Sequence, residues 1–284
     1  MRALSGSRRT GFALAASVGA GLVAALTVRR RRVSKQITDL LDHMETEQGR
    51  VAGDPYDPDD VADLPAPVRR YFDTVLTDGQ RTVDTVRISQ QGTFRLGGAE
   101  ADWYPFTANQ TYTVSPPSYV WDATIDLATG VSARVLDAYV DGEGRLRANL
   151  LGALPVATAG PDPQTNEAEL QRYLTEAPWF PTALLPAAGV SWAGIDDRSA
   201  RATITDGDVT ATAVFHFDEE GYITRVTADR YRQDTDSVDS WVGYHRSYEI
   251  RDGTKVPTEA EVGWETTDGV VPYWRGTITE RAVE

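Results

Sequence analysis

The sequence predicts a mainly β, α+β protein built on a strongly curved antiparallel sheet, a half-barrel with one or two helices on its concave face. Three observations support this prediction. From residue 82 onward, apolar and polar residues alternate with the period of two that is typical of strands. Asp-Gly pairs at 206–207, 252–253 and 268–269 separate alternating runs, as in tight hairpins. A single strong helix signal, at 166–177, interrupts the series. We expect roughly ten or eleven strands.

The N-terminal stretch predicts a membrane helix ahead of this body. The run Gly11 to Val28 has 18 residues and no charge, near the lower limit for crossing a bilayer core of ~30 Å. Arg8 and Arg9 precede it in a pattern that resembles a twin-arginine export signal. No small-x-small cleavage site follows before Arg29 to Arg32, so we predict that residues 1–32 are an uncleaved anchor with basic flanks. The positive-inside rule favours a cytoplasmic body and the twin-arginine pattern favours export, so the side of the membrane stays open.

Between this anchor and the body we expect a stalk and a linker. Residues 33–48 carry a helical apolar stripe, which predicts an amphipathic stalk helix that lies on the membrane surface or packs on the body. Residues 49–63 are acidic and contain two prolines, a composition typical of a linker. The β-rich body then occupies residues 64–284. It begins with a helix from Leu64 to Leu76, in which Pro67 suits the first turn.

The helix at 166–177 is the element around which the strands are arranged. Asn166 and Glu169 have the spacing of a capping box, and Pro178 ends the helix. The next residues form a proline-bracketed apolar plug, Trp179 to Leu185. Two interpretations stay open, because the plug either fills the groove of the sheet as ordinary core or forms one wall of an apolar ligand pocket.

Aromatic residues supply most of the candidate site. The chain has 7 Trp, 12 Tyr and 7 Phe, and a curved sheet lined with such residues and closed by a helix is suited to binding an apolar molecule. The predicted ligand-binding residues come from the helix, the plug and three strands: Tyr173, Trp179, Phe180, Leu184, Trp121, Trp241 and Trp264. The leading hypothesis is therefore a membrane-tethered protein that binds a lipid or another apolar ligand. The main alternative is a structural envelope protein with a filled core and no ligand.

Signals for catalysis or for a cofactor are weak. There is no Cys, and the histidines at 43, 216 and 245 lack metal-ligand spacing. No G-x-S-x-G elbow and no glycine-rich phosphate loop occur. We therefore predict no metal, no cofactor and no catalytic residue. A hydrolase that pairs an acid with His216 or His245 remains a third, weaker hypothesis.

The charge distribution excludes one class of partner. The formal net charge is −14, but residues 36–284 carry 20 basic and 42 acidic residues, a net charge of −22. Nucleic-acid binding needs a positive surface, so we predict no nucleic-acid partner. The Asp-rich, Lys-poor composition resembles that of proteins from extreme halophiles, in which molar salt screens such repulsion. The oligomeric state is left open.

Four motifs together resemble a known family. They are Leu64 to Phe72 (LPAPVRRYF), Tyr139 to Gly144, the WFP motif at 179–181 within the segment 173–185, and Phe217 to Gly221. They resemble a family of membrane-anchored prokaryotic proteins whose domain is of unknown function, here in a haloarchaeal-like member. The resemblance covers roughly residues 60–282 and implies a hydrophobic N-terminal segment followed by a β-rich body. It implies no reaction. A looser analogy, in fold only, is to the half-barrels of lipoprotein carriers.

Overall fold

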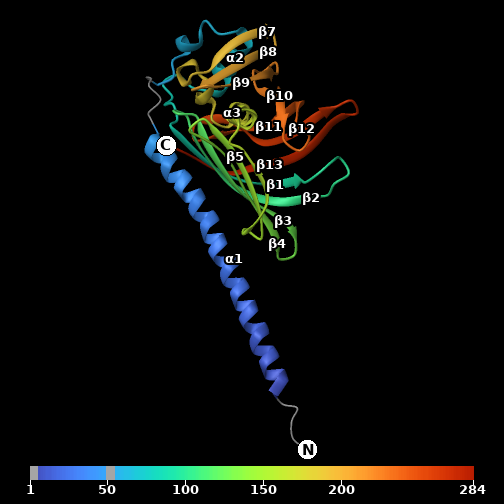
Figure 1. Cartoon of the computed structure of the whole chain (residues 1–284). Coiled ribbons are helices and arrows are strands. Elements are labelled where there is room, and N and C mark those ends of the chain that lie inside the picture. The colour runs from blue at the N-terminus through green and yellow to red at the C-terminus, as the bar shows by residue number, and fades with distance from the viewer. Residues whose placement is uncertain (1–5, 49–54) are drawn as a thin grey trace, which may run out of the picture.

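The protein folds around one large antiparallel sheet that curves around a central helix (Figure 1). The computed structural model describes residues 6–48 and 55–284, with side chains described from residue 24. The sheet has 13 strands and every neighbouring pair is antiparallel. The predicted mainly β class is confirmed, whereas the expected number of strands was too low.

The strands follow the alternating runs of the sequence closely. Their bounds are β1 Thr85–Arg95, β2 Trp103–Thr113, β3 Ser118–Ala128, β4 Val131–Val140, β5 Glu143–Leu150, β6 Leu154–Ala159, β7 Ser191–Asp196, β8 Ser199–Asp206, β9 Val209–Phe217, β10 Ile223–Arg232, β11 Ser237–Arg251, β12 Thr254–Thr266 and β13 Gly269–Val283. The strand β6 is the one that the alternation does not mark. This strand is an edge strand whose residues are mostly exposed, so no apolar alternation marks it.

The strand order explains how the helix reaches the concave face. The order is β6-β5-β4-β3-β2-β1-β13-β12-β11-β10-β9-β8-β7, so two runs of consecutive hairpins join where β1 pairs with β13. The two sheet edges, β6 and β7, are consecutive in the chain. Helix α3 (Pro163–Glu176) and three short 3₁₀ helices connect them. This connection must pass from one edge of the sheet to the other, and it does so across the concave face.

Helix α3 begins three residues earlier than the predicted capping box. Asp162 is the N-cap, and its side chain accepts a hydrogen bond of 2.9 Å from the Thr165 N–H. Pro163 occupies the first turn, where its fixed φ favours a helix start. Asn166 instead uses its Oδ1 to accept a hydrogen bond of 2.9 Å from the Gly144 N–H. The predicted cap therefore joins the helix to β5, and the capping box was wrong.

The proline-bracketed plug forms three 3₁₀ helices, η2 Ala177–Trp179, η3 Pro181–Leu184 and η4 Pro186–Ala188. The prolines begin each of the short helices or occupy its first turn, because proline lacks the N–H that a helix start leaves unpaired. Phe180 and Leu184 are fully buried. The plug is thus part of the main hydrophobic core.

Two further elements pack against the body. Helix α2 (Ala66–Val75) buries Val68, Tyr71, Phe72 and Val75, as its periodicity predicts. Before it, the 3₁₀ helix η1 (Pro58–Val61) buries Val61, and Tyr56 is buried as well. Part of the predicted linker 49–63 is therefore packed on the body, while residues 49–54 lie outside the described residues.

Helix α1 (Gly6–Glu47) is the longest helix. Its C-terminal half packs on the outer face of the sheet, where Ile37 and Met44 form a second apolar cluster with residues of β3 and β4. Residues 33–47 of the predicted stalk thus pack on the body. Within the described part of the chain, no helix combines the length and the apolar character needed to cross a membrane. The anchor predicted at 11–28 falls mostly where side chains are not described, and it stays a prediction.

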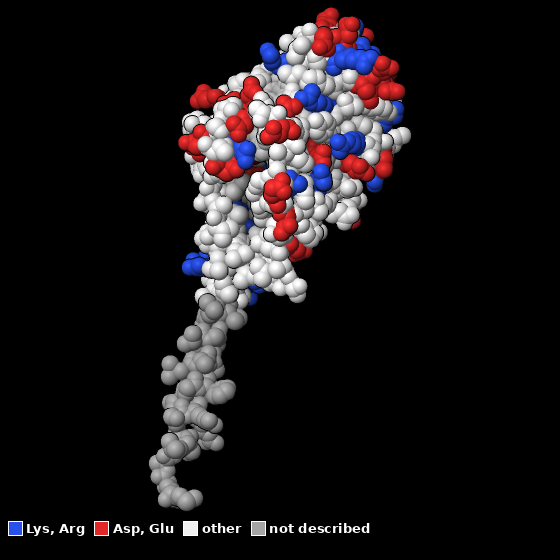
Figure 2. Space-filling model, turned by 90° about the vertical axis from the view of Figure 1, so that its right-hand side faces the viewer, with Lys and Arg blue, Asp and Glu red and all other residues white. Residues whose placement is uncertain are grey.

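Charged residues are unevenly spread over the surface. On the face drawn in Figure 2, Asp and Glu gather on the upper part of the body, with Lys and Arg among them. The lower end of the body is mostly uncharged on the same face. On this face the acidic excess of residues 36–284 is thus concentrated away from the lower end of the body.

Candidate functional site: a cavity on the concave face

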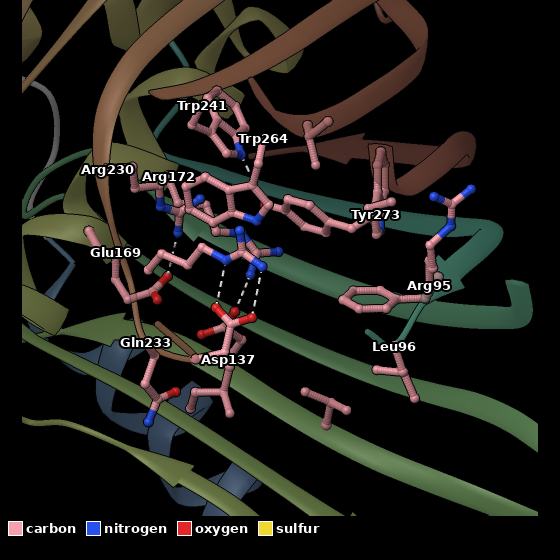
Figure 3. Close-up of a pocket in the computed structure, with 18 of the residues that line it drawn as sticks. Arg95, Leu96, Asp137, Glu169, Arg172, Arg230, Gln233, Trp241, Trp264 and Tyr273 are labelled. Atoms are coloured by element: carbon pink, nitrogen blue, oxygen red, sulfur yellow. Dashed lines mark hydrogen bonds and ion pairs between the residues drawn. The ribbon is translucent and has the colours of Figure 1, made fainter. Parts of the chain in front are cut away.

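A cavity of about 570 Å³ lies between α3 and the concave face of the sheet (Figure 3). Its lining reaches the β1–β2 turn at Phe94 to Ala99 and the β10–β11 turn at Arg232 to Asp234. Because Leu96 to Ala99 and Gln233 to Asp234 are exposed, the cavity opens to solvent at the end of the sheet where these hairpins turn. The volume lies within the range of about 300–1,000 Å³ that is typical of small-molecule sites.

Aromatic side chains from separate elements form much of the wall. Trp121 on β3, Trp179 in η2, Trp241 on β11 and Trp264 on β12 all border the cavity. Two of these indoles are held by hydrogen bonds: Trp121 donates to Gln90 over 2.9 Å and Trp241 donates to the Tyr273 hydroxyl over 2.9 Å. Fixed indoles keep their apolar faces turned to one space, which favours a preformed apolar site.

Small residues leave room between these indoles. Several alanines border the cavity, on α3 and on strands of both halves of the sheet: Ala148, Ala157, Ala159, Ala168 and Ala260. Since side chains of a strand alternate between the two faces, a small residue at an inward position leaves space that a larger one would fill. The alanines at these inward positions thus leave the space that forms the cavity.

The structure divides the seven residues predicted from the sequence into two groups. Trp121, Trp179, Trp241 and Trp264 border the cavity. Tyr173, Phe180 and Leu184 do not border it, and they are exposed by only 1%, 0% and 0%. These three pack against the aromatic core, where the Phe180 and Tyr112 ring centroids are 4.4 Å apart. Their part in the site is at most to support the elements that form the wall.

A buried ionic cluster forms one side of the cavity, and no pattern in the sequence predicts it specifically. Arg172 pairs with Asp137 and, over 2.9 Å, with Glu176. Arg230 lies 3.5 Å from Glu169. Figure 3 shows Asp137, Arg172, Glu169 and Arg230 converging from β4, α3 and β10. Only the i,i+4 spacing of Arg172 and Glu176 is visible in the sequence, and that pattern is also typical of a solvated helix face.

Neutral groups complete the cluster. The Tyr112 hydroxyl and the Gln110 amide each donate a hydrogen bond of 2.8 Å to the same Glu176 oxygen. The Tyr119 hydroxyl donates to Glu169. The Arg172 guanidinium also lies 5.1 Å from the ring centroids of Tyr119 and Trp121, a cation–π arrangement. Such extra contacts offset the cost of taking paired charges out of water.

Asp137 is the titratable group that this environment changes most clearly. Burial, with a further contribution from the nearby Glu169 charge, raises the pKa of Asp137 to about 7, although Arg172 and Arg230 act in the opposite direction. Its Oδ1 is buried without a hydrogen-bond partner among the described residues. The two guanidinium groups of the cluster therefore face three carboxyl groups, of which Asp137 ionises less readily than it would in water.

Within residues 24–48 and 55–284, whose side chains are described, no histidine pairs with an acid at the cavity. His245 borders the cavity, and burial lowers its pKa to about 4, so its ring is neutral at pH 7. Its Nδ1 has no hydrogen-bond partner in the part of the chain that the structure describes, and its ring lies 6.3 Å from that of Trp179. His216 contacts Thr227, and His43 pairs with Asp141 on the outside of the sheet. The acid–histidine pair that a hydrolase would need is therefore not formed here.

Metal binding finds no support in the described ranges either. Across residues 6–48 and 55–284, no group of three or more His, Asp or Glu side chains is arranged to hold an ion. The acidic residues of the β10–β11 turn have local partners, since Asp234 pairs with Arg232, and Asp236 accepts a hydrogen bond from Tyr231. This turn is a network of surface contacts at the edge of the cavity.

Comparison with known proteins places the chain in a family. The model of a family of unknown function, DUF6920, matches residues 62–282. The chain belongs to this family. The match spans α2, α3 and nearly all of the sheet, and so covers the whole cavity. A search of curated proteins gave no match. Among solved structures, a LolA superfamily protein from Nitrosomonas europaea is 9% identical, with 77% of this chain and 92% of that chain covered and a TM-score of 0.34. That similarity is too low to carry an inference about this chain.

Proposed function

We propose that the protein binds one mostly apolar small molecule, such as a lipid, in the cavity on its concave face. The observation that carries the proposal is the open cavity of about 570 Å³ with Trp121, Trp179, Trp241 and Trp264 in its wall. A structural protein with a filled core would have larger side chains at the inward alanine positions. Apolar surface that stays in contact with water forgoes hydrophobic stabilisation, so an open apolar cavity of this size supports an occupant that covers it.

The ionic cluster narrows the chemistry of that occupant. Its arginines are already paired with carboxyl groups, and Glu169 and Glu176 already accept hydrogen bonds from Tyr119, Tyr112 and Gln110. Beside this cluster a further buried charge would have no free counterion and would cost desolvation energy. The Nε of Arg95, nearer the opening, is a group of the wall that has no hydrogen-bond partner among the described residues. We therefore propose a ligand whose polar part is uncharged, for example a hydroxyl or an ester, attached to an apolar chain or ring system.

Tethering to a membrane belongs to the same proposal. The uncharged run Gly11 to Val28, with Arg29 to Arg32 after it, supports an anchor of limiting length. An anchor in α1 would hold the cavity close to a bilayer, where apolar molecules are concentrated. The side of the membrane and any protein partner are not part of the proposal.

A pair of fluorescent probes tests this function. N-phenyl-naphthylamine is apolar and uncharged, and anilinonaphthalene sulfonate has nearly the same ring system with a negative charge. We expect the uncharged probe to bind the full chain in mild detergent, with energy transfer from the cavity tryptophans, and the sulfonate to bind at least about tenfold more weakly. Equal binding of the two would contradict the uncharged ligand class.

Matched substitutions locate the probe. Ala148→Phe fills the cavity from β5, whereas Ala282→Phe adds the same ring to an exposed position on β13. We expect Ala148→Phe to abolish saturable probe binding and Ala282→Phe to leave it unchanged. Saturable binding that survives Ala148→Phe, in a variant that unfolds with the cooperativity of the natural protein, would contradict binding in this cavity.

A further inference from the structure

Helix α1 runs along the outside of the sheet and contacts turns at both ends of its strands. Near its C-terminus, His43 Nε2 lies 2.7 Å from Asp141 Oδ2, in the turn between β4 and β5. Toward its N-terminus, Arg30 Nε donates a hydrogen bond of 2.6 Å to the Leu151 carbonyl, in the turn between β5 and β6. The helix continues from there back to Gly6, so about half of its length projects beyond the β5–β6 turn (Figure 1).

The cavity opens at the same end of the sheet. Because all neighbouring strands are antiparallel, one end of the strands carries the turns β1–β2, β3–β4, β5–β6, β8–β9, β10–β11 and β12–β13. The other end carries the turns β2–β3, β4–β5, β7–β8, β9–β10 and β11–β12. The β1–β2 and β10–β11 turns border the cavity opening. The projecting part of α1 and the opening therefore lie at the same end of the strands, although the curvature of the sheet carries the β1–β2 and β12–β13 hairpins to the side of α1 (Figure 1).

Exposed apolar side chains gather at this end. The described residues include nine large apolar side chains that are exposed, and seven of them lie on the turns and strand ends of this end or on α1 beside it: Val28, Leu96, Val131, Leu154, Val156, Val238 and Val270. The other two, Ile195 and Ile250, lie at the opposite end. Single exposed apolar residues need no explanation, but their concentration at one end indicates an interaction surface.

At this end of the sheet, the turns far from α1 are acidic and the segments near α1 are uncharged. The turns farther from α1 carry Asp206, Asp234 and Asp268, whereas the segments Ala128 to Val131 and Leu150 to Leu154, close to α1, carry no charge. Beside them, the exposed Arg29 to Arg32 form a basic patch on α1. Val28 is the last residue of the uncharged run and precedes Arg30 by two residues. At a rise of about 1.5 Å per residue, the run therefore lies only about 3 Å farther along α1 than Arg30, on the projecting side.

From this arrangement we infer that the β3–β4 and β5–β6 turns, together with Arg29 to Arg32, dock on the surface of an anionic lipid bilayer, with the cavity opening turned toward it. The inference rests on the proposed tether but not on what the cavity holds. Val131, Leu154 and Val156 are placed to enter the interface between headgroups and acyl chains. The arginines lie at the level of the headgroups, where each basic residue near an anionic surface gains about 1 kcal/mol.

Docking in this orientation has a consequence for ligand exchange. The acidic part of the body shown in Figure 2 lies away from the bilayer, which reduces repulsion from anionic lipids. The opening of the cavity, next to Leu96, lies near the interface. An apolar molecule can then pass between bilayer and cavity without crossing water, whereas the opposite orientation would require it to do so.

Site-specific labels test the orientation, because the chain has no Cys of its own. The single-cysteine variants Leu154→Cys and Val131→Cys receive an environment-sensitive fluorophore. Ile250→Cys, at a position that is 69% exposed at the other end, is the matched control. The full chain is reconstituted into vesicles of phosphatidylcholine and phosphatidylglycerol. Nitroxides on lipid acyl chains and a water-soluble quencher then report the surroundings of each label.

We expect lipid-borne nitroxides to quench the labels at 154 and 131 roughly threefold more than the label at 250, and the aqueous quencher to give the reverse order. Vesicle flotation reports tethering separately. Vesicles that carry the protein but leave all three labels in water would overturn the docking while the tether stands. Protein that does not float with the vesicles would overturn both. Neither result depends on binding in the cavity, which the uncharged probe reports.

Discussion

The closed end and the open end of the concave face are both built from aromatic residues, yet only one of them is filled. At the closed end, the ring centroids of Tyr112, Tyr173 and Phe180 lie 4.4–6.3 Å apart, and all three side chains are fully buried. At the open end, Trp121, Trp241 and Trp264 face a cavity of about 570 Å³. The difference comes from their neighbours, because alanines and a self-compensating ionic cluster occupy the inward positions around the cavity.

This difference shows that aromatic content alone does not identify a binding site. Large rings fill a core when other large side chains oppose them, and they form a wall when small side chains do. The two regions should therefore respond differently to the same kind of substitution. The closed end should mainly determine stability, and the open end should mainly determine binding.

The largest effect is expected from Phe180→Ala. Removal of this fully buried ring leaves a cavity in the core and should lower the free energy of unfolding by about 3–5 kcal/mol. Trp264→Ala, at the partly exposed wall of the cavity, should cost at most about 2 kcal/mol. Chemical denaturation of both variants measures this. Equal losses would mean that the cavity wall is ordinary core.

The next effect concerns the ionic cluster and pH. The pKa of Asp137 is about 7 in the folded protein and about 3.9 in an unfolded chain. The folded state therefore holds this proton more tightly, and the stabilisation is complete below about pH 4 and is lost as the pH rises through about 7. Asp137→Asn lacks this dependence. The free energy of unfolding of Asp137→Asn minus that of the natural protein should therefore rise by up to about 4 kcal/mol as the pH increases from about 4 to above 7.

Denaturation curves at constant salt, at about pH 4 and about pH 8, measure this change, and the other carboxylates cancel in the comparison. A difference between Asp137→Asn and the natural protein that is independent of pH would show that folding leaves the pKa of Asp137 near that of an unfolded chain, so that the group is ionised at neutral pH. The cluster would then carry a net negative charge, and the argument for an uncharged ligand would fail.

A smaller effect is expected on binding at the open end. Trp264→Ala removes one wall of the cavity and should weaken binding of N-phenyl-naphthylamine about tenfold. Trp103→Ala is the control, because Trp103 lies outside the cavity between the guanidinium groups of Arg95 and Arg275. Fluorescence titration measures both. Equal weakening by the two variants would place the probe elsewhere.

The smallest effect is expected from Tyr273→Phe. The substitution removes the hydroxyl that accepts the hydrogen bond from Trp241 and leaves the ring in place. We expect a loss of about 1 kcal/mol in stability and a broader tryptophan emission spectrum. An unchanged spectrum would show that another group holds the Trp241 indole.

The sequence predicted the sheet well, because strict alternation and Asp-Gly turns mark most of its strands. It failed at β6, whose exposed edge position leaves no alternation, and at the start of α3, where Asp162 rather than Asn166 forms the cap. Four of the seven predicted site residues border the cavity. The others, such as Phe180, could not be told apart, because burial depends on which strands the curved sheet brings opposite them.

The ionic cluster was missed for a related reason. Arg172 and Glu176 look like the solvated face of a helix, and Asp137 looks like one of many surface acids. Helix α3 connects the two edges of the sheet across the concave face, so its Arg172 and Glu176 face the sheet and not the solvent. There they meet Asp137 of β4, and Arg230 of β10 joins the same cluster. Such a cluster is a product of the topology, so no local pattern in the sequence predicts it.

Native mass spectrometry of the full chain, released from mild detergent after purification in molar salt and combined with lipid extraction, tests the central claim most directly. The binding account predicts one uncharged, mostly apolar molecule per chain, retained by the natural protein and by Ala282→Phe and lost from Ala148→Phe. A chain that carries no such molecule, and that retains none when lipids with uncharged polar groups are added, would contradict the account.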